Sequence, residues 1–334
     1  MSKCLKLFCL ALVSLCWVGQ PVDRANSSGP ALLDPNLPIY RPTERIKGEL
    51  KLGGSNTLSH VAAVWIASFQ EFYPDTKITI EVNGSRAAID DVKAGKTDIG
   101  LLSRRVREDE IETFQEAFGY PPTVLTPCLE RTGIYVHKDN PLKGLTLAEL
   151  DAIFSTECKR GAKEPCRQWG QLGLKGAWAS RPIGAHGRTM ETGSQVFLQE
   201  AVLLGGPMRE DIQNHESNID LVQAIAKNPA AIGFAGLSYA TPEVRAVPLA
   251  LAEGEDYVAI DSLEADRGAY PLVRRLQLVV KHDPKQELRP IEREFIRYVF
   301  STQGQEDVVK AGFQAIPAQP ARVALDAVGL GLSR

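Results

Sequence analysis

Two stretches of the chain repeat one order of elements, a short apolar strand, a loop of small residues and an amphipathic helix, and this repetition constrains the fold most. In the first stretch, apolar and β-branched runs predict strands at 50–52, 78–82 and 98–102. Apolar residues spaced three and four apart predict a helix over 58–72, and a shorter helix follows at 87–94. Such alternation predicts an α/β fold with a mostly parallel sheet covered by helices.

The second stretch has the same order. A strand at 182–185 precedes helices at 195–204 and 219–227, and another strand follows at 231–235. Strands at 132–137 and 272–281 fit as paired connections between two halves. With 334 residues, a length suited to two domains, the sequence predicts lobe I at 48–133 and 273–325, lobe II at 134–272, and a two-strand hinge between them.

The beginning of the chain has the pattern of a targeting segment. Lys3 and Lys6 precede an apolar run at 7–18, which is too short to span a bilayer comfortably, and polar residues follow at 20–30. This order predicts a secretory signal peptide at 1–25, an extended arm at 26–47 and a periplasmic protein. A lipid anchor on Cys16 is the alternative, although Leu15 is larger than such sites usually tolerate.

Three of the six cysteines lie beyond the predicted signal. Cys158 and Cys166 flank a polar segment with few apolar anchors, so in an oxidising compartment we expect a disulfide between them. A zinc site is the rival, but neither a Cys-x-x-Cys pair nor two histidines at ligand spacing accompany these residues. Cys128 is then expected to be a buried thiol.

Three loops share the design of an anion site, because each ends a strand with small or hydroxyl residues and starts a helix. A helix start leaves backbone N–H groups without partners and favours negative charge. Arg188, close to the third loop, adds a permanently charged bidentate donor. In each loop taken alone, the hydroxyl residue is better explained as an ordinary helix N-cap, but three such loops in two similar halves, with an arginine beside one, favour an anion site. The loops comprise Gly54-Ser55-Asn56-Thr57, Gly84-Ser85 and Thr192-Gly193-Ser194.

The sequence resembles the periplasmic phosphate-binding proteins of ABC transporters over nearly all of residues 50–317. The most specific match is the run from Arg188 to Thr192-Gly193-Ser194, and the others are 52–57, 97–104 and 270–275. The resemblance implies a type II periplasmic-binding-protein fold, closure of two lobes around inorganic phosphate without metal or cofactor, and a partner permease in the inner membrane. It implies ligand contacts from Ser55, Asn56, Thr57, Ser85, Arg188, Thr192, Gly193 and Ser194.

One position departs from the pattern of these proteins. Many of them carry an aspartate just after the strand at 98–102, where it accepts a proton from hydrogen phosphate, whereas this chain has Ser103 followed by Arg104. A serine hydroxyl either donates or accepts, while a carboxylate repels fully ionised sulfate. From Ser103 we expect weaker discrimination of phosphate against sulfate.

Other classes of function fit the sequence less well. The five histidines show no metal spacing, and no nucleophile elbow or phosphate-cradling Gly-x-x-x-x-Gly-Lys loop is present, so we expect no enzyme. A formal net charge of −3 argues against broad nucleic-acid binding. Binding of sulfate, molybdate or a phosphonate, or a non-transport role as a phosphate sensor, stays open. We expect a monomer.

Overall fold

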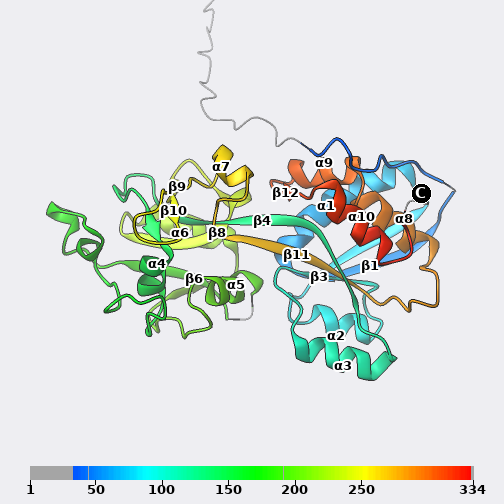
Figure 1. Ribbon diagram of the computed structural model, residues 1–334, viewed down its shortest axis with the longest axis horizontal. Helices are drawn as coiled ribbons and strands as arrows, with labels where there is room; N and C mark the ends of the chain where they lie inside the picture. Colours follow the sequence, from blue (N-terminus) through cyan, green and yellow to red (C-terminus); the bar gives the residue numbers. More distant parts are fainter. Residues whose placement is uncertain (1–32, 44, 191, 332–334) are drawn as a thin grey trace, which may run out of the picture.

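The structure, a computed structural model, describes residues 33–43, 45–190 and 192–331. Two bodies lie side by side and are joined by two long strands, β4 (Thr123–His137) and β11 (Val273–Val280) (Figure 1). The strands follow one path in the order β2-β1-β3-β11-β4-β8-β6-β7. The pairs at both ends of this path are parallel, and the pairs that involve β11 and β4 are antiparallel.

The first body, lobe I, contains both the early part of the chain and its C-terminal helices. Its core packs Trp65 and Phe69 of one helix against Phe295 of another, all of them fully buried. Its elements are β1 (Gly48–Gly54), α1 (Asn56–Phe72), β2 (Thr76–Val82), α2 (Ala88–Lys93), β3 (Ile99–Leu102), α3 (Glu108–Phe118), α8 (Pro290–Val299), α9 (Thr302–Lys310), β12 (Gln314–Ala315) and α10 (Ala318–Asp326).

The second body, lobe II, comes from the middle of the chain and has a separate core. Phe154, Trp169 and Phe234 are fully buried there. Its elements are β5 (Leu145–Thr146), α4 (Leu147–Phe154), η1 (Trp169–Leu172), η2 (Gly176–Trp178), β6 (Gly184–Arg188), α5 (Gly193–Ala201), β7 (Gln213–His215), α6 (Asn218–Lys227), β8 (Ala231–Gly236), η3 (Leu237–Tyr239), β9 (Val244–Ala246), β10 (Leu249–Ala250) and α7 (Leu263–Asp266).

Strand β4 changes partner where it passes between the lobes. Residues up to Arg131 pair with β11, and from Thr132 onwards they pair with β8. At this point the Thr132 amide donates to the Leu272 carbonyl at 2.8 Å, and the Tyr270 hydroxyl donates to the Thr132 carbonyl at 3.0 Å. The two connections between the lobes therefore lie side by side and are hydrogen-bonded to each other.

The described part of the predicted N-terminal arm packs on lobe I. Leu37, Tyr40 and Ile46 are buried in its core, and the Tyr40 hydroxyl contacts both Tyr73 and Glu294. The predicted signal peptide and Cys16 lie outside the described residues. Within those residues no helix is both long and apolar enough to cross a membrane.

The predicted disulfide between Cys158 and Cys166 is wrong in this structure, where both are free, buried thiols. The Cys158 amide donates to Ser155 Oγ, and the Cys166 thiol donates to the Gln168 carbonyl. Two arginines hold the polar segment instead, because their guanidinium groups donate to backbone carbonyls of the helices beside it. Arg160 donates to Ala201 and Val202, and Arg167 to Ala152, Ile153 and Ser155. Cys128 is a buried thiol, as expected.

Candidate functional site

The first turns of two helices, one from each lobe, converge on a single guanidinium group. Arg274 Nη2 donates to Thr57 Oγ1 of α1 at 3.3 Å and to Ser194 Oγ of α5 at 3.0 Å. All three side chains are buried. The positive ends of both helices therefore face a point that already carries a cation, which is an arrangement that attracts an anion.

Local sequence explains why the two helices begin here. Ser55 Oγ accepts the Leu58 amide at 3.2 Å, and Thr192 Oγ1 accepts the Gln195 amide at 3.3 Å, so both residues are N-caps. The Ser55 amide donates to the Leu101 carbonyl at 2.8 Å. The donors that remain for a ligand are the first two N–H groups of each helix, those of Asn56 and Thr57 and of Gly193 and Ser194, which have no intrahelical acceptor. The hydroxyls of Thr57 and Ser194 add to them.

The second loop joins the strand end at Ser103. Ser85 Oγ accepts the Ser103 amide at 3.0 Å and lies 3.1 Å from Ser103 Oγ. Arg104 supports this loop from behind, because its guanidinium pairs with Glu110 at 2.6 Å and donates to the Ser85 carbonyl at 3.2 Å. The ion pair with Glu110 holds the Arg104 side chain in lobe I.

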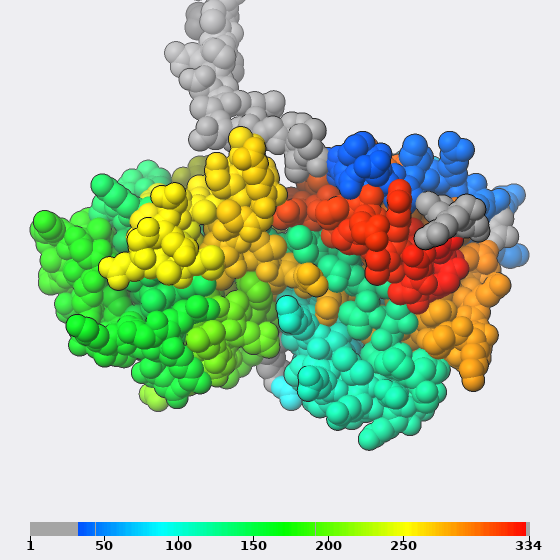
Figure 2. Space-filling model, in the orientation of Figure 1, coloured from blue at the N-terminus to red at the C-terminus, as the bar shows by residue number. Residues whose placement is uncertain are grey.

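Lobe I and lobe II meet at Ser103. A β-carbon added to Gly193 would overlap Ser103 Oγ, so the start of α5 lies directly against the end of β3. Arg274 Nη1 also donates to the Ser103 carbonyl at 3.1 Å. Figure 2 shows a notch between the two lobes, where the green surface of lobe II faces the cyan surface of lobe I.

Arg188 occupies the end of β6 and is bound within lobe II. Its guanidinium donates to Asn218 Oδ1 at 2.7 Å, to the His215 carbonyl at 3.0 Å and to the Glu216 carbonyl at 2.6 Å. Burial lowers the pKa of Arg188; the acidic phenol of Tyr239 raises it, and the nearby positive charge of Arg274 lowers it. Arg188 therefore lies close enough to interact electrostatically with Arg274, although its guanidinium donates to partners within lobe II.

Not every predicted residue joins the buried cluster. Ser55, Thr57, Ser85, Ser103, Arg188 and Ser194 are buried, whereas Thr192 is half-buried and Asn56 is exposed. Although the Asn56 side chain is exposed, its backbone belongs to the first turn of α1.

The sequence reasoning missed two buried residues of the cluster, Arg274 and Glu130. They are opposite each other in the antiparallel pairing of β11 with β4, and the Arg274 guanidinium pairs with Glu130 Oε2. Arg274 lies in the 270–275 segment that resembles phosphate-binding proteins, which was the available signal. For Glu130 the sequence offers no such signal, because strand pairing alone brings it to Arg274.

A pair of histidines neighbours Arg188, since His186 lies in the same strand and the His215 carbonyl accepts from the Arg188 guanidinium. His186 Nδ1 and His215 Nε2 are 2.9 Å apart, their rings are stacked, and His186 Nε2 is buried without a hydrogen-bond partner. Burial, and to a smaller extent the electrostatic effect of neighbouring His215, lowers the pKa of His186 to about 4. His186 is therefore a neutral core residue at pH 7.

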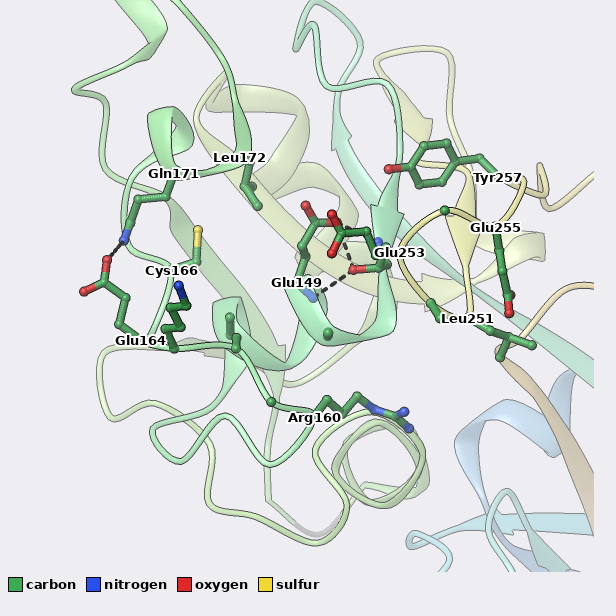
Figure 3. A pocket seen from close by; sticks show the side chains of 18 residues that line it. Glu149, Arg160, Glu164, Cys166, Gln171, Leu172, Leu251, Glu253, Glu255 and Tyr257 are labelled. Atoms are coloured by element: carbon green, nitrogen blue, oxygen red, sulfur yellow. Dashed lines mark hydrogen bonds between the residues drawn. The ribbon is translucent and has the colours of Figure 1, made fainter.

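A cavity of about 750 Å³ lies in lobe II, apart from this cluster. Four carboxylates line it, those of Glu149, Glu164, Glu253 and Glu255 (Figure 3), and none of the predicted phosphate-binding residues does. Arg160 and Lys163 also line it, so the carboxylates outnumber the cationic side chains and the excess negative charge disfavours an anion. Across the described ranges, no three His, Cys, Asp or Glu side chains group as metal ligands do.

Two α/β lobes, joined by paired strands and meeting at two helix N-termini, define the class of two-lobed solute-binding proteins. Residues 41–303 match the family model described as the PBP superfamily domain. The phosphate-binding protein PstS of Pseudomonas aeruginosa PAO1 is 34% identical over 319 residues, which cover 96% of this chain and 98% of that protein. The chain belongs to the PBP superfamily and, within it, to the PstS family of phosphate-binding proteins.

Solved structures share the fold. An ABC-type phosphate transport receptor from Vibrio cholerae has a TM-score of 0.64 at 20% identity, covering 80% of this chain and all of that one. PstS from Borrelia burgdorferi has a TM-score of 0.54 at 20% identity, covering 81% and 99%. The type II periplasmic-binding-protein fold predicted from the sequence is confirmed.

Proposed function

We propose that this protein binds inorganic phosphate between the first turns of α1 and α5 and delivers it to the permease of an ABC transporter. The observation that carries the proposal is the convergence of Thr57, Ser194 and Arg274 on one buried point between the lobes. Membership of the PstS family, with a relative 34% identical over nearly the whole chain, supports phosphate as the anion.

The ligand contacts are divided between the lobes. Lobe I contributes Ser55, Asn56, Thr57, Ser85 and Ser103, and lobe II contributes Arg188, Thr192, Gly193 and Ser194. We add Arg274, which lies between the two sets. Because Ser55 and Thr192 cap their helices, they act chiefly by fixing the backbone N–H groups, and Asn56 contributes through its amide. About seven hydrogen bonds to a charged ligand at roughly 1.5–3 kcal/mol each exceed the roughly 8 kcal/mol of micromolar binding, which leaves a margin for closure.

Binding drives closure of the lobes. An anion contacted from both sides stabilises the closed state, since only differential affinity shifts such an equilibrium. We place the hinge at 132–135 and 272–276, where β4 changes partner and the two connections bond to each other. The lobe limits are then 48–133 with 273–325, and 134–272.

The cellular setting follows from the same proposal. The protein is a monomer without catalytic activity that works in the periplasm, reached through the predicted signal peptide at 1–25. Its partners are phosphate and the membrane-embedded permease subunits, and it requires no cofactor.

Isothermal titration of the mature protein, dialysed exhaustively to remove bound anion, tests the proposal. The titrants are phosphate, arsenate, sulfate and molybdate. We expect phosphate to bind at micromolar concentration or tighter, and arsenate to follow closely because its size and charge are similar. Absence of binding by every oxyanion would overturn the proposal and leave the loops as helix caps only.

A further inference from the structure

Glu130 is a buried carboxylate with one oxygen unused. It is 2% exposed; Oε2 pairs with Arg274, and Oε1 has no hydrogen-bond partner. A β-carbon on Gly236 of lobe II would overlap Oε1, so the glycine leaves room for this oxygen at the seam between the lobes. A buried acceptor without a partner is costly and calls for an explanation.

Arg274 connects Glu130 to the proposed anion site, because its guanidinium pairs with Glu130 Oε2 and donates to Thr57 and Ser194. Burial raises the pKa of Glu130, and the charge and hydrogen bonds of Arg274 oppose that rise. Burial raises the pKa of Tyr239, and of the charges acting on that phenol, Glu130 raises it while Arg188 and Arg274 lower it. The carboxylate, the phenol and the two guanidinium groups therefore belong to one electrostatic cluster. Several titratable or charged groups interact electrostatically with Glu130. They are Arg274 from β11, His60 from α1, Tyr239 from η3, and Cys128 and Tyr135 from β4.

The other groups of the site do not distinguish hydrogen phosphate from sulfate. The two dianions have similar size and the same charge, but only hydrogen phosphate carries a proton that it can donate. Backbone N–H groups and guanidinium groups only donate, and the hydroxyls of Ser85 and Ser103 rotate to suit either ligand. A carboxylate only accepts, so it bonds to the protonated oxygen of phosphate and repels every oxygen of sulfate.

We infer that Glu130 is the specificity-determining residue of the site, with Oε1 accepting the proton of hydrogen phosphate while Arg274 holds Oε2. The inference rests on the proposed phosphate binding at this site. From Ser103 alone we expected weak discrimination of phosphate against sulfate. Glu130 changes this expectation, because β4 supplies the carboxylate acceptor that is missing after β3. The wild-type protein is then expected to bind phosphate at least about 100-fold more tightly than sulfate, since a like-charge contact costs several kcal/mol.

The test compares phosphate and sulfate titrations of the wild type with those of Glu130→Gln. Glutamine keeps the shape and an acceptor oxygen for Arg274, but it loses the charge. We expect the phosphate-to-sulfate affinity ratio to fall at least tenfold, mainly through stronger sulfate binding. Glu294→Gln is the matched control, because Glu294 is also buried and paired with an arginine, yet its oxygens are already bonded to Arg297 and to the hydroxyls of Tyr40 and Tyr73.

The outcomes separate the two proposals. A wild type that binds no oxyanion overturns the proposed function. A wild type that binds phosphate and sulfate equally, or a Glu130→Gln variant that keeps the wild-type ratio, overturns the role of Glu130 alone. If Glu130→Gln does not fold, Glu130→Asp decides: this variant is expected to keep excluding sulfate, and equal binding of both anions by it would contradict the inference. The double variant Ser103→Asp/Glu130→Gln is expected to restore the ratio, and failure to restore it would also count against a carboxylate acceptor.

Discussion

Gly193, the first residue of α5, lies so close to Ser103 at the end of β3 that a β-carbon on the glycine would overlap the serine hydroxyl. The contact joins lobe II to lobe I beside Arg274, which donates to the Ser103 carbonyl. Since Gly193 also begins a helix, its amide is a free donor in the same place. The absence of a side chain therefore serves both the approach of the lobes and the approach of a ligand to the backbone.

Gly193→Ala is expected to weaken phosphate binding at least tenfold while leaving the melting temperature nearly unchanged, because the added methyl group holds the lobes apart without entering either core. Titration calorimetry measures the first effect and thermal unfolding the second. Gly184→Ala in β6 is the control, since a β-carbon there meets its nearest neighbour only at 3.4 Å. Wild-type affinity in Gly193→Ala would show that the lobes need not meet at Ser103.

Arg274→Gln is expected to reduce phosphate affinity by roughly 2–5 kcal/mol, because it removes a buried charge that contacts both helix starts and leaves Glu130 unpaired. Titration with phosphate measures the loss. Arg275→Gln changes the neighbouring residue, whose side chain is exposed, and is expected to bind as the wild type does. Equal losses in the two variants would mean that only the overall charge matters.

The stability of the protein is expected to fall as the pH is lowered from about 6.5 to about 4, in part because of His186. Burial lowers the pKa of this histidine to about 4 in the folded state, so the unfolded chain takes up a proton that the folded protein refuses. The resulting loss in the free energy of unfolding reaches up to about 3 kcal/mol at the acid end of this range. The loss is absent above the pKa that His186 has in the unfolded chain. Denaturant unfolding at pH 7 and pH 4.5 should show a smaller difference for His186→Asn, and an identical difference would argue against this origin.

Tyr40→Phe is expected to destabilise the protein by about 1–3 kcal/mol, because the Tyr40 hydroxyl donates to the fully buried carboxylate of Glu294 at 2.9 Å. Denaturant unfolding measures the cost. Ile39→Ala, at a neighbouring position that is 66% exposed, is expected to change stability by less than about 0.5 kcal/mol. A neutral Tyr40→Phe would show that the arm does not stabilise lobe I through this bond.

The local pattern of the sequence predicted several elements well. The helix expected at 58–72 is α1 (Asn56–Phe72), and the strand expected at 78–82 is β2 (Thr76–Val82). Helical spacing and β-branched runs report on the neighbouring residues alone, so they need no tertiary information. Helix α1 begins at Asn56, two residues earlier than predicted, because Ser55 caps it three residues before the apolar stripe begins at Leu58.

Elements that depend on distant partners were predicted less completely. Strand β4 (Thr123–His137) was expected only over 132–137, because Pro127, Glu130 and Arg131 interrupt its apolar pattern. Pairing with β11 accommodates them, since Arg274 neutralises Glu130, and Asp266 of lobe II pairs with Arg131 at 2.6 Å. Charged residues within an apolar run weaken the local strand signal, although here they lie where the two lobes are joined.

By itself, the sequence determined the strand and helix order, the capped helix starts at Ser55 and Thr192, and the candidate loops at the strand ends. These follow from side-chain periodicity and from hydrogen bonds that span three residues. Only the tertiary structure decided which loops meet, that Arg188 is bound within its own lobe, and that Arg274 and Glu130 lie at the centre of the cluster. The physical reason is strand order: β11 lies between β3 and β4, and its partners are far away in the chain, so no local pattern could place them there.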